Sequence, residues 1–184
     1  MNNIKIVLIN TSHPGNIGAS ARAMKNMGLS KLVLVTPKCD IDEVAYARCS
    51  NATDILDNAE IKDSLDAALS DSHLVFGTRG RKASLAIPQL DVKQAIEVIE
   101  NKQNNNIAIL FGNEQSGLSN AELSRCHYHI TIPTSEYASL NLAQAVQILT
   151  YEIYQAFGIG IQNNIAILLF CLFSITSMAC FTSN

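Results

Sequence analysis

Five short apolar runs divide the chain and predict the strands of a sheet. They cover residues 4–9, 32–35, 74–76, 107–111 and 128–132. Apolar residues follow one another in these runs almost without interruption, instead of alternating with polar residues. This pattern is typical of parallel strands that are covered on both faces.

Stretches with helical periodicity alternate with these runs. Strands that alternate with helices predict an α/β domain in which helices flank a mostly parallel sheet. The composition changes abruptly near residue 160, so we expect one domain over residues 1–160 and an apolar tail over residues 161–184. The predicted helices cover about residues 16–27, 42–48, 64–70, 91–101, 119–124 and 141–157.

The first and last predicted helices differ in how they distribute apolar residues. At about 100° per residue, Ile17, Ala21 and Met24 form one stripe of the first helix, and Arg22 projects from another face. A solvent-exposed arginine is the simplest interpretation of Arg22. Helix 141–157 is apolar over most of its circumference and therefore needs a second covering surface besides its own domain, which predicts a dimer.

Residues 165–181 form an uncharged stretch of seventeen residues. This length lies at the lower limit of about 17–25 residues for a membrane-spanning helix. Three interpretations stay open: a tail anchor, an apolar segment packed on the domain, or an aberrant C-terminus such as a frameshifted end. No basic residue flanks the stretch and it has no amphipathic period, which favours the third, so we expect no stable membrane contact.

Charge and cysteine content narrow the function classes. The net charge of −3 excludes a wholly basic surface, so any nucleic-acid contact must be local. Five cysteines without a CxxC pair or a signal peptide are typical of a reduced, cytoplasmic protein. His127 and His129 have no further ligand nearby in the sequence, so no metal site is predicted.

The sequence lacks the motifs of several enzyme classes. Gly112 and Gly117 have the spacing of a phosphate loop, but Leu118-Ser119 stands where a lysine and a hydroxyl residue are required. The stretch HPGNIG has the wrong spacing for a dinucleotide site, and neither GxSxG nor HExxH occurs. NTPase, ordinary dinucleotide-binding and hydrolase functions are therefore not supported.

Three polar stretches follow predicted strands. They cover residues 10–28, 109–119 and 132–146. Because the carboxyl ends of parallel strands meet at one edge of a sheet, these stretches should gather where ligands of α/β proteins bind. Helix capping could also explain the polar residues Asn16 and Ser139 or Asn141, whereas a carboxylate at position 114, in a glycine turn, has a weaker structural explanation.

Together, the segments GNIGASARAMKNMG, FGNEQSGLS, CHYHI and EYASLNLAQAVQI resemble the SPOUT methyltransferases of the TrmH-like branch, over about residues 4–157. The resemblance implies a C-terminal trefoil knot, S-adenosyl-L-methionine as cofactor and a homodimer formed through the knot and helix 141–157. It also implies 2′-O-methylation of RNA, and the most similar branch members act on the pyrimidine at nucleotide 32 of the tRNA anticodon loop. An rRNA target is the alternative within the class.

The match ends near residue 158, where members of this kind usually continue into an extension that helps hold tRNA. A catalytically silent module that binds RNA or cofactor is therefore the alternative from another class.

The resemblance also assigns roles to individual residues. The arginine of the first motif faces the ribose 2′-hydroxyl, and a guanidinium with a pKa above about 12 is a poor base. We therefore interpret it as a group that stabilises alkoxide charge and holds a phosphate, with a role as base as the alternative. We expect the glycines of the second motif to let the backbone approach the cofactor. The implied catalytic residues are Asn16, Arg22, Glu114, Ser139 and Asn141. The implied cofactor-binding residues are Thr78, Arg79, Gly80, Leu110, Gly112, Ile132, Ser139 and Leu140. The implied RNA-binding residues are Arg22, Lys25, Arg79, Arg81 and Lys82.

Overall fold

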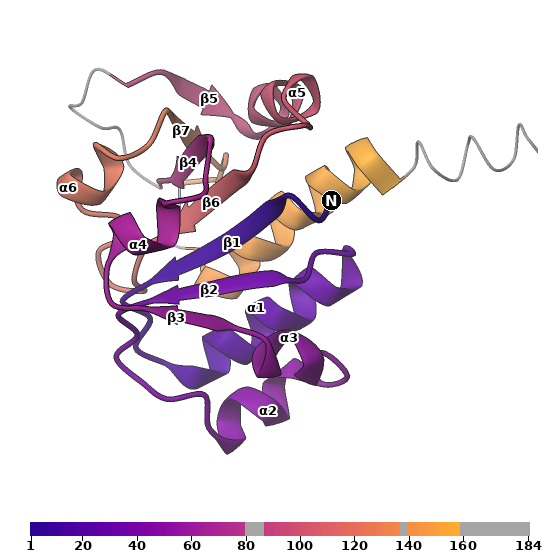
Figure 1. The fold of residues 1–184 in the computed structure, drawn as a ribbon, viewed down its shortest axis with the longest axis vertical. Helices are drawn as coiled ribbons and strands as arrows, with labels where there is room; N and C mark the ends of the chain where they lie inside the picture. The colour runs from indigo at the N-terminus through magenta and orange to yellow at the C-terminus, as the bar shows by residue number, and fades with distance from the viewer. Residues whose placement is uncertain (80–86, 137–139, 159–184) are drawn as a thin grey trace, which may run out of the picture.

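A seven-stranded sheet forms the centre of the computed structural model, which describes residues 1–79, 87–136 and 140–158. The strand order is β3-β2-β1-β6-β4-β7-β5, and the pairings between neighbouring strands are parallel (Figure 1). The predicted fold class of helices flanking a mostly parallel sheet is thereby confirmed. The strands are β1 (Ile4–Ile9), β2 (Lys31–Val35), β3 (Glu60–Lys62), β4 (Leu74–Thr78), β5 (Gln89–Asp91), β6 (Ile107–Phe111) and β7 (Tyr128–Thr131).

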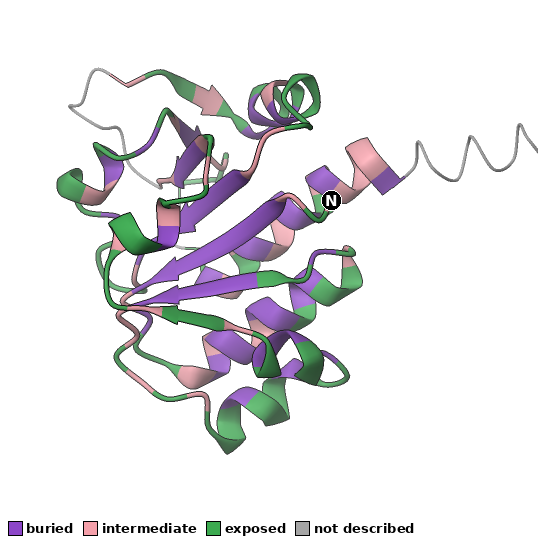
Figure 2. Ribbon diagram, viewed as in Figure 1, coloured by how far each residue is buried: buried purple, intermediate pink, exposed green. Residues whose placement is uncertain are grey.

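Helices cover both faces of the sheet. The larger apolar cluster holds α1, α2, α3, α5 and a helix over residues 142–158 against one face, and α4 and α6 pack on the other. Residues of the inner strands are buried from both sides, whereas the edge strands β3 and β5 and the outer surfaces of the helices are largely exposed (Figure 2). The helices are α1 (Pro14–Asn26), α2 (Glu43–Cys49), α3 (Thr53–Asp57), α4 (Leu65–Leu69), α5 (Val92–Asn101) and α6 (Asn120–Leu123).

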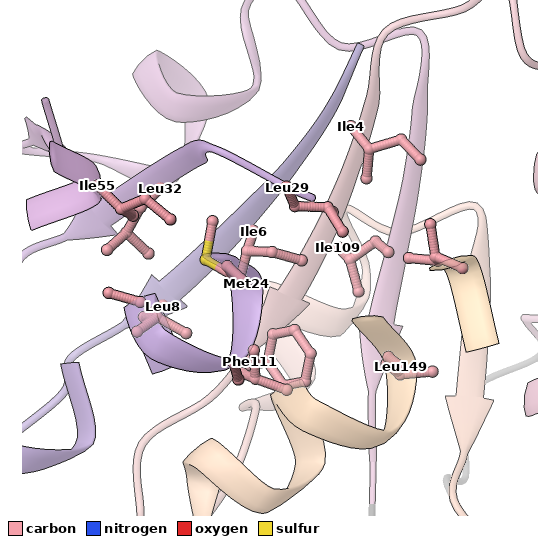
Figure 3. Packing of buried hydrophobic residues seen from close by; sticks show 14 of the residues in the cluster. Ile4, Ile6, Leu8, Met24, Leu29, Leu32, Ile55, Ile109, Phe111 and Leu149 are labelled. Carbon is pink, nitrogen blue, oxygen red and sulfur yellow. The ribbon is translucent and has the colours of Figure 1, made fainter. Parts of the chain in front are cut away.

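The inner strand β1 is apolar at every position except Lys5, because both of its faces are covered. Ile6 and Leu8 pack into the larger cluster beside Met24 of α1 (Figure 3), whereas Val7 packs into the smaller cluster. Lys5 is buried as well, and its Nζ donates hydrogen bonds to the Ala68 carbonyl and to the side chain of Asp71. A strand with both faces covered thus tolerates a lysine only because its charge is paired.

Helix α1 begins two residues earlier than expected. His13 is the N-cap residue, and its Nδ1 accepts a hydrogen bond from the Gly15 N–H at 3.0 Å. Pro14 follows at the first helical position, where its missing N–H has no cost. The alternative explanation of Asn16 as the cap of this helix therefore does not apply, because Asn16 already lies within the first turn.

The helix over residues 142–158 follows its prediction closely. Asn141 caps it, since its Oδ1 accepts from the Ala143 N–H at 2.9 Å. Leu142, Val146, Leu149 and Ile153 form its buried stripe, and Leu149 lies against the sheet (Figure 3). On the outer side Ile148 is half-buried and Tyr151 is 45% exposed.

The C-terminal tail lies outside the described residues, as does the predicted domain boundary at residue 160. Within the ranges that the structure describes, no helix has the length and apolar character needed to cross a membrane.

Candidate functional site

A cavity of about 530 Å³ opens at the carboxyl ends of β4, β6 and β7. Three segments surround it: the end of β4, the turn that follows β6, and the segment that follows β7. This is the edge at which ligands of parallel α/β sheets collect. The residues that line the cavity are Thr78, Arg79, the segment 111–118, Ile132, Thr134, Leu140, Leu142 and Ala145.

The turn after β6 is held together by its own hydrogen bonds. Asn113 Oδ1 accepts from the backbone N–H groups of Gln115 and Ser116, at 3.0 and 2.8 Å. A Cβ on Gly112 would lie 2.0 Å from the carbonyl carbon of Gly117, and Gly117 itself has a φ of +69°. Both glycines are therefore required by the closure of the turn itself, a reason that the sequence alone does not reveal.

Three of the predicted catalytic residues meet in one chain of hydrogen bonds. Asn141 Nδ2 donates to Asn16 Oδ1 at 3.0 Å, and Asn16 Nδ2 donates to Glu114 Oε1 at 2.8 Å. Ser12 completes the chain, since its backbone N–H and its hydroxyl donate to Glu114 Oε2 at 3.1 and 3.0 Å. The three polar stretches of the sequence thus meet at one place: Glu114 accepts from Ser12 and Asn16, and Asn16 in turn accepts from Asn141.

The environment of Glu114 keeps its carboxylate ionised. Partial burial raises the pKa of Glu114, but the hydrogen bonds from Asn16, from its own backbone and from Ser12 outweigh this effect and hold the pKa below its ordinary value. A carboxylate with a lowered pKa and both oxygens already occupied is a weak base. Its chemistry is that of a fixed negative charge that orients amide groups.

Most of the described residues predicted to bind cofactor line the cavity. Thr78, Arg79, Gly112, Ile132 and Leu140 all do so. The hydroxyl at position 78 also donates to the backbone carbonyl of residue 110 at 2.9 Å, which ties the ends of β4 and β6 together.

Leu110, also predicted to bind the cofactor, does not line the cavity. Its side chain is fully buried in the smaller apolar cluster. Successive side chains of a strand point to opposite faces of the sheet. Phe111, the next residue of β6, therefore lines the cavity in its place.

The basic residues predicted to bind RNA are more dispersed. Arg22 is exposed on α1 and is not among the residues that line the cavity. Lys25 forms a salt bridge with Asp54, with 2.6 Å between Lys25 Nζ and Asp54 Oδ2. Arg79 reaches Asn120 Oδ1 at 3.5 Å. Four further site predictions lie outside the described residues: Gly80, Arg81, Lys82 and Ser139.

The two histidines near β7 have structural partners. His127 Nδ1 accepts from the Val75 N–H at 3.1 Å, and the buried His129 places its Nε2 3.4 Å from the Leu123 carbonyl oxygen. Across residues 1–79, 87–136 and 140–158, no group of three or more His, Cys, Asp or Glu side chains is arranged to hold a metal ion.

The sequence alone does not identify Ser12 as a residue of the site. Its one visible signal was its position three residues after the end of β1, within the polar stretch 10–28. Serine is common in such loops, and only the fold brings it to a carboxylate 102 residues away in the sequence.

Comparison with known proteins gives a consistent picture. Residues 3–151 match the SpoU rRNA Methylase family. The chain is 51% identical over 159 residues to the tRNA (cytidine/uridine/adenosine-2′-O-)-methyltransferase TrmJ of Pseudomonas aeruginosa, covering 85% of this chain and 62% of that protein. It is 48% identical over 155 residues to the tRNA (cytidine/uridine-2′-O-)-methyltransferase TrmJ of Pectobacterium atrosepticum, covering 83% of this chain and 64% of that protein. It thus spans less than two thirds of the length of these relatives.

Two solved structures are similar over most of the chain. A probable methylase family protein from Haemophilus influenzae superposes with a TM-score of 0.82 at 48% identity, covering 89% of this chain and 69% of that one. TrmJ from Z. mobilis superposes with a TM-score of 0.79 at 34% identity, covering 83% and 69%.

Proposed function

This chain belongs to the SpoU rRNA methylase family, and from that premise we propose that it transfers a methyl group from S-adenosyl-L-methionine to a ribose 2′-hydroxyl of RNA. The proposed target is the pyrimidine at nucleotide 32 of the tRNA anticodon loop. The observation that carries the proposal is the hydrogen-bonded chain of Ser12, Glu114, Asn16 and Asn141, which joins the three motifs at the rim of the cavity. The names of the similar tRNA 2′-O-methyltransferases support a tRNA substrate.

The cavity suits a cofactor of this kind. Its volume falls within the range of about 300–1,000 Å³ that small-molecule sites occupy. Phe111, Ile132 and Leu140 offer apolar walls for a nucleobase, and Thr78 and Arg79 add polar groups at its edge. When bound, S-adenosylmethionine supplies an electrophilic methyl group on a sulfonium.

The residues around the cavity limit how the hydroxyl proton can leave. Glu114 is ionised but already accepts hydrogen bonds on both oxygens, and a guanidinium with a pKa above about 12 is a poor base. We therefore assign Glu114 the task of orienting Asn16 and Asn141. Arg22 would stabilise the developing alkoxide and hold an adjacent phosphate, with the proton passing to phosphate or water.

A homodimer would solve the problem of where Arg22 acts. This residue does not line the cavity of its own chain, yet it lies on the exposed side of α1. The partly exposed Ile148 and Tyr151 on helix 142–158 offer an apolar surface for a second copy. We propose that this helix, together with the knotted segment, forms the dimer and brings Arg22 of one subunit to the cavity of the other.

The sheet order supports the proposed trefoil knot. Strand β7 lies between β4 and β5, although β5 follows β4 in the chain (Figure 1). Ile132, Thr134 and Leu140, which follow β7 in the chain, line the same cavity as the turn 112–118. A later strand placed between two earlier ones is compatible with a knotted C-terminal region, a topology that most folds avoid.

The extent of the active unit is also part of the proposal. We assign the activity to a domain over residues 1–160, with 161–184 as a tail, and place the protein in the cytoplasm. A silent module that binds RNA or cofactor is the second candidate function, because Arg22 does not line the cavity of its own chain.

Methyl transfer from labelled S-adenosylmethionine to tRNA and to rRNA transcripts tests the proposal. We expect the full chain to label the ribose of tRNA. Labelling of rRNA alone would overturn the tRNA assignment. Cofactor or RNA binding without transfer would establish the silent module and contradict the enzyme.

A further inference from the structure

Ser12 donates two hydrogen bonds to one oxygen of the Glu114 carboxylate. Its backbone N–H and its hydroxyl both point to Oε2, at 3.1 and 3.0 Å. The other oxygen, Oε1, is thereby left to Asn16. Because its two oxygens accept from different residues, the Glu114 carboxylate is held in one rotational position.

The hydrogen bonds from Ser12 to Glu114 also affect the orientation of the Asn16 and Asn141 side-chain amides. An asparagine amide donates from one end and accepts at the other, so it can turn over when no neighbour defines its orientation. With Glu114 Oε1 as a fixed acceptor, Asn16 must present its Nδ2 to Glu114 and its Oδ1 to Asn141. Ser12 thus determines the orientation of amides that it does not touch.

The segments that Ser12 and Glu114 join are each supported independently. The end of β1 is held by the Asn10 N–H bonded to the Val35 carbonyl at 2.9 Å, and by Thr36 Oγ1 donating to Asn10 Oδ1 at 2.8 Å. Asn10 has a φ of 52°, which turns the chain toward the cavity edge just before Ser12.

The turn that carries Glu114 is closed by Asn113, and its far end is fixed by a second carboxylate. Glu122 accepts from the Ser119 N–H and hydroxyl at 2.6 and 2.8 Å, and also lies 3.4 Å from Asn10 Nδ2. Loss of the Ser12 hydroxyl should therefore loosen the Glu114 side chain without unfolding either segment.

We propose that Ser12 is a positioning residue for this site: its hydroxyl holds Glu114 in the orientation that aligns the Asn16 and Asn141 amides with the RNA ribose. The inference rests on the proposed methyl-transfer function and adds a residue to it. The competing explanation is a hydrogen bond that merely stabilises the loop.

Two substitutions of nearly equal shape separate these explanations. Ser12→Thr keeps the hydroxyl, and Ser12→Val replaces it with a methyl group, while both keep the backbone N–H and the same branching. Ser30→Ala, in the exposed loop before β2, is the matched control. Each full-length variant is assayed for single-turnover methyl transfer to a tRNA transcript, for S-adenosylmethionine affinity by calorimetry, and for its melting temperature.

We expect Ser12→Val to lower the rate of methyl transfer about tenfold, the loss typical of one hydrogen bond to a charged acceptor. Ser12→Thr should stay within about twofold of the wild type, and cofactor affinity and melting temperature should be unchanged in all three variants. Equal rates for Ser12→Val and Ser12→Thr would overturn the proposal. So would a loss of rate in Ser12→Val that runs parallel to losses of melting temperature and cofactor affinity, because that pattern indicates general loosening. A wild-type chain that methylates no RNA contradicts the proposed function itself, and the role of Ser12 falls with it.

Discussion

The side-chain amide of Asn16 donates a hydrogen bond to the Glu114 carboxylate at 2.8 Å, although 98 residues separate the two in the sequence. One residue lies in the first turn of α1 and the other in the turn after β6. Their contact joins the first and second motifs at the carboxyl edge of the sheet. Asn141 extends the contact to the third motif, so a single carboxylate organises the rim of the cavity.

Replacing Glu114 with glutamine should make stability less dependent on pH. The hydrogen bonds of the folded protein hold the pKa of Glu114 below its ordinary value of about 4.3. Its ionised form therefore stabilises the fold at neutral pH, and this contribution is lost as the pH falls through the lower, folded-state pKa. The melting temperatures of wild type and Glu114→Gln should differ at pH 7 and converge toward pH 3. A difference that stays constant over this range would contradict the assignment.

The two glycines of the turn should differ in their tolerance of alanine. A Cβ at Gly112 would lie 2.0 Å from the backbone of Gly117, so Gly112→Ala should cost about 3 kcal/mol or more. A Cβ at Gly117 meets no atom within 4 Å, and only its φ of +69° is unfavourable, so Gly117→Ala should cost about 1 kcal/mol. Urea unfolding measures both values. Equal costs would show that the turn closes differently.

Arg22→Ala should abolish most of the activity while leaving the fold intact. Arg22 is exposed on α1, away from the buried stripe of that helix, so neither cofactor affinity nor melting temperature should change. Loss of an electrostatic stabiliser of this kind typically lowers turnover about 10²–10³-fold. Arg22→Lys should recover little, because lysine lacks the planar fork that holds a hydroxyl and a phosphate together. Wild-type turnover in Arg22→Ala would leave this residue as an ordinary solvated arginine.

A charge on the outer side of helix 142–158 should disrupt the proposed dimer. Tyr151 is 45% exposed on that side, so Tyr151→Glu should yield a monomer in light scattering, whereas the wild type should be a dimer at micromolar concentration. Asn104→Glu adds the same charge to the exposed loop between α5 and β6 and should leave the dimer intact. A wild-type monomer would contradict the dimer, and with it the delivery of Arg22 from a second subunit.

The elements that could be predicted from the sequence are those with continuous apolar runs. The five predicted strands all exist, and β1 has the predicted bounds. The strands β3 and β5 escaped prediction because each is a three-residue strand at an edge of the sheet with exposed polar residues, so neither leaves an apolar run. The five-residue helix α3 is too short to show a helical period.

The position of the site could be predicted, because the ends of parallel strands mark it, but several of its side-chain contacts could not. Parallel strands bring their carboxyl ends to one edge, which is why Glu114 and Asn141 could be expected near each other. The burial of Leu110 depends on which face of the sheet each side chain of β6 meets, and continuous apolar sequence does not encode that choice. The pairing of Lys25 with Asp54 likewise depends on the packing of α1 against α3.

A map of 2′-O-methylation at single-nucleotide resolution tests the central claim most directly. It compares tRNA and rRNA from cells that have the gene, cells that lack it, and deletion cells that carry Arg22→Ala. We predict that methylation of the pyrimidine at nucleotide 32 of tRNA disappears with the gene, returns with the wild-type copy, and does not return with Arg22→Ala. Identical maps in cells with and without the gene would contradict the account.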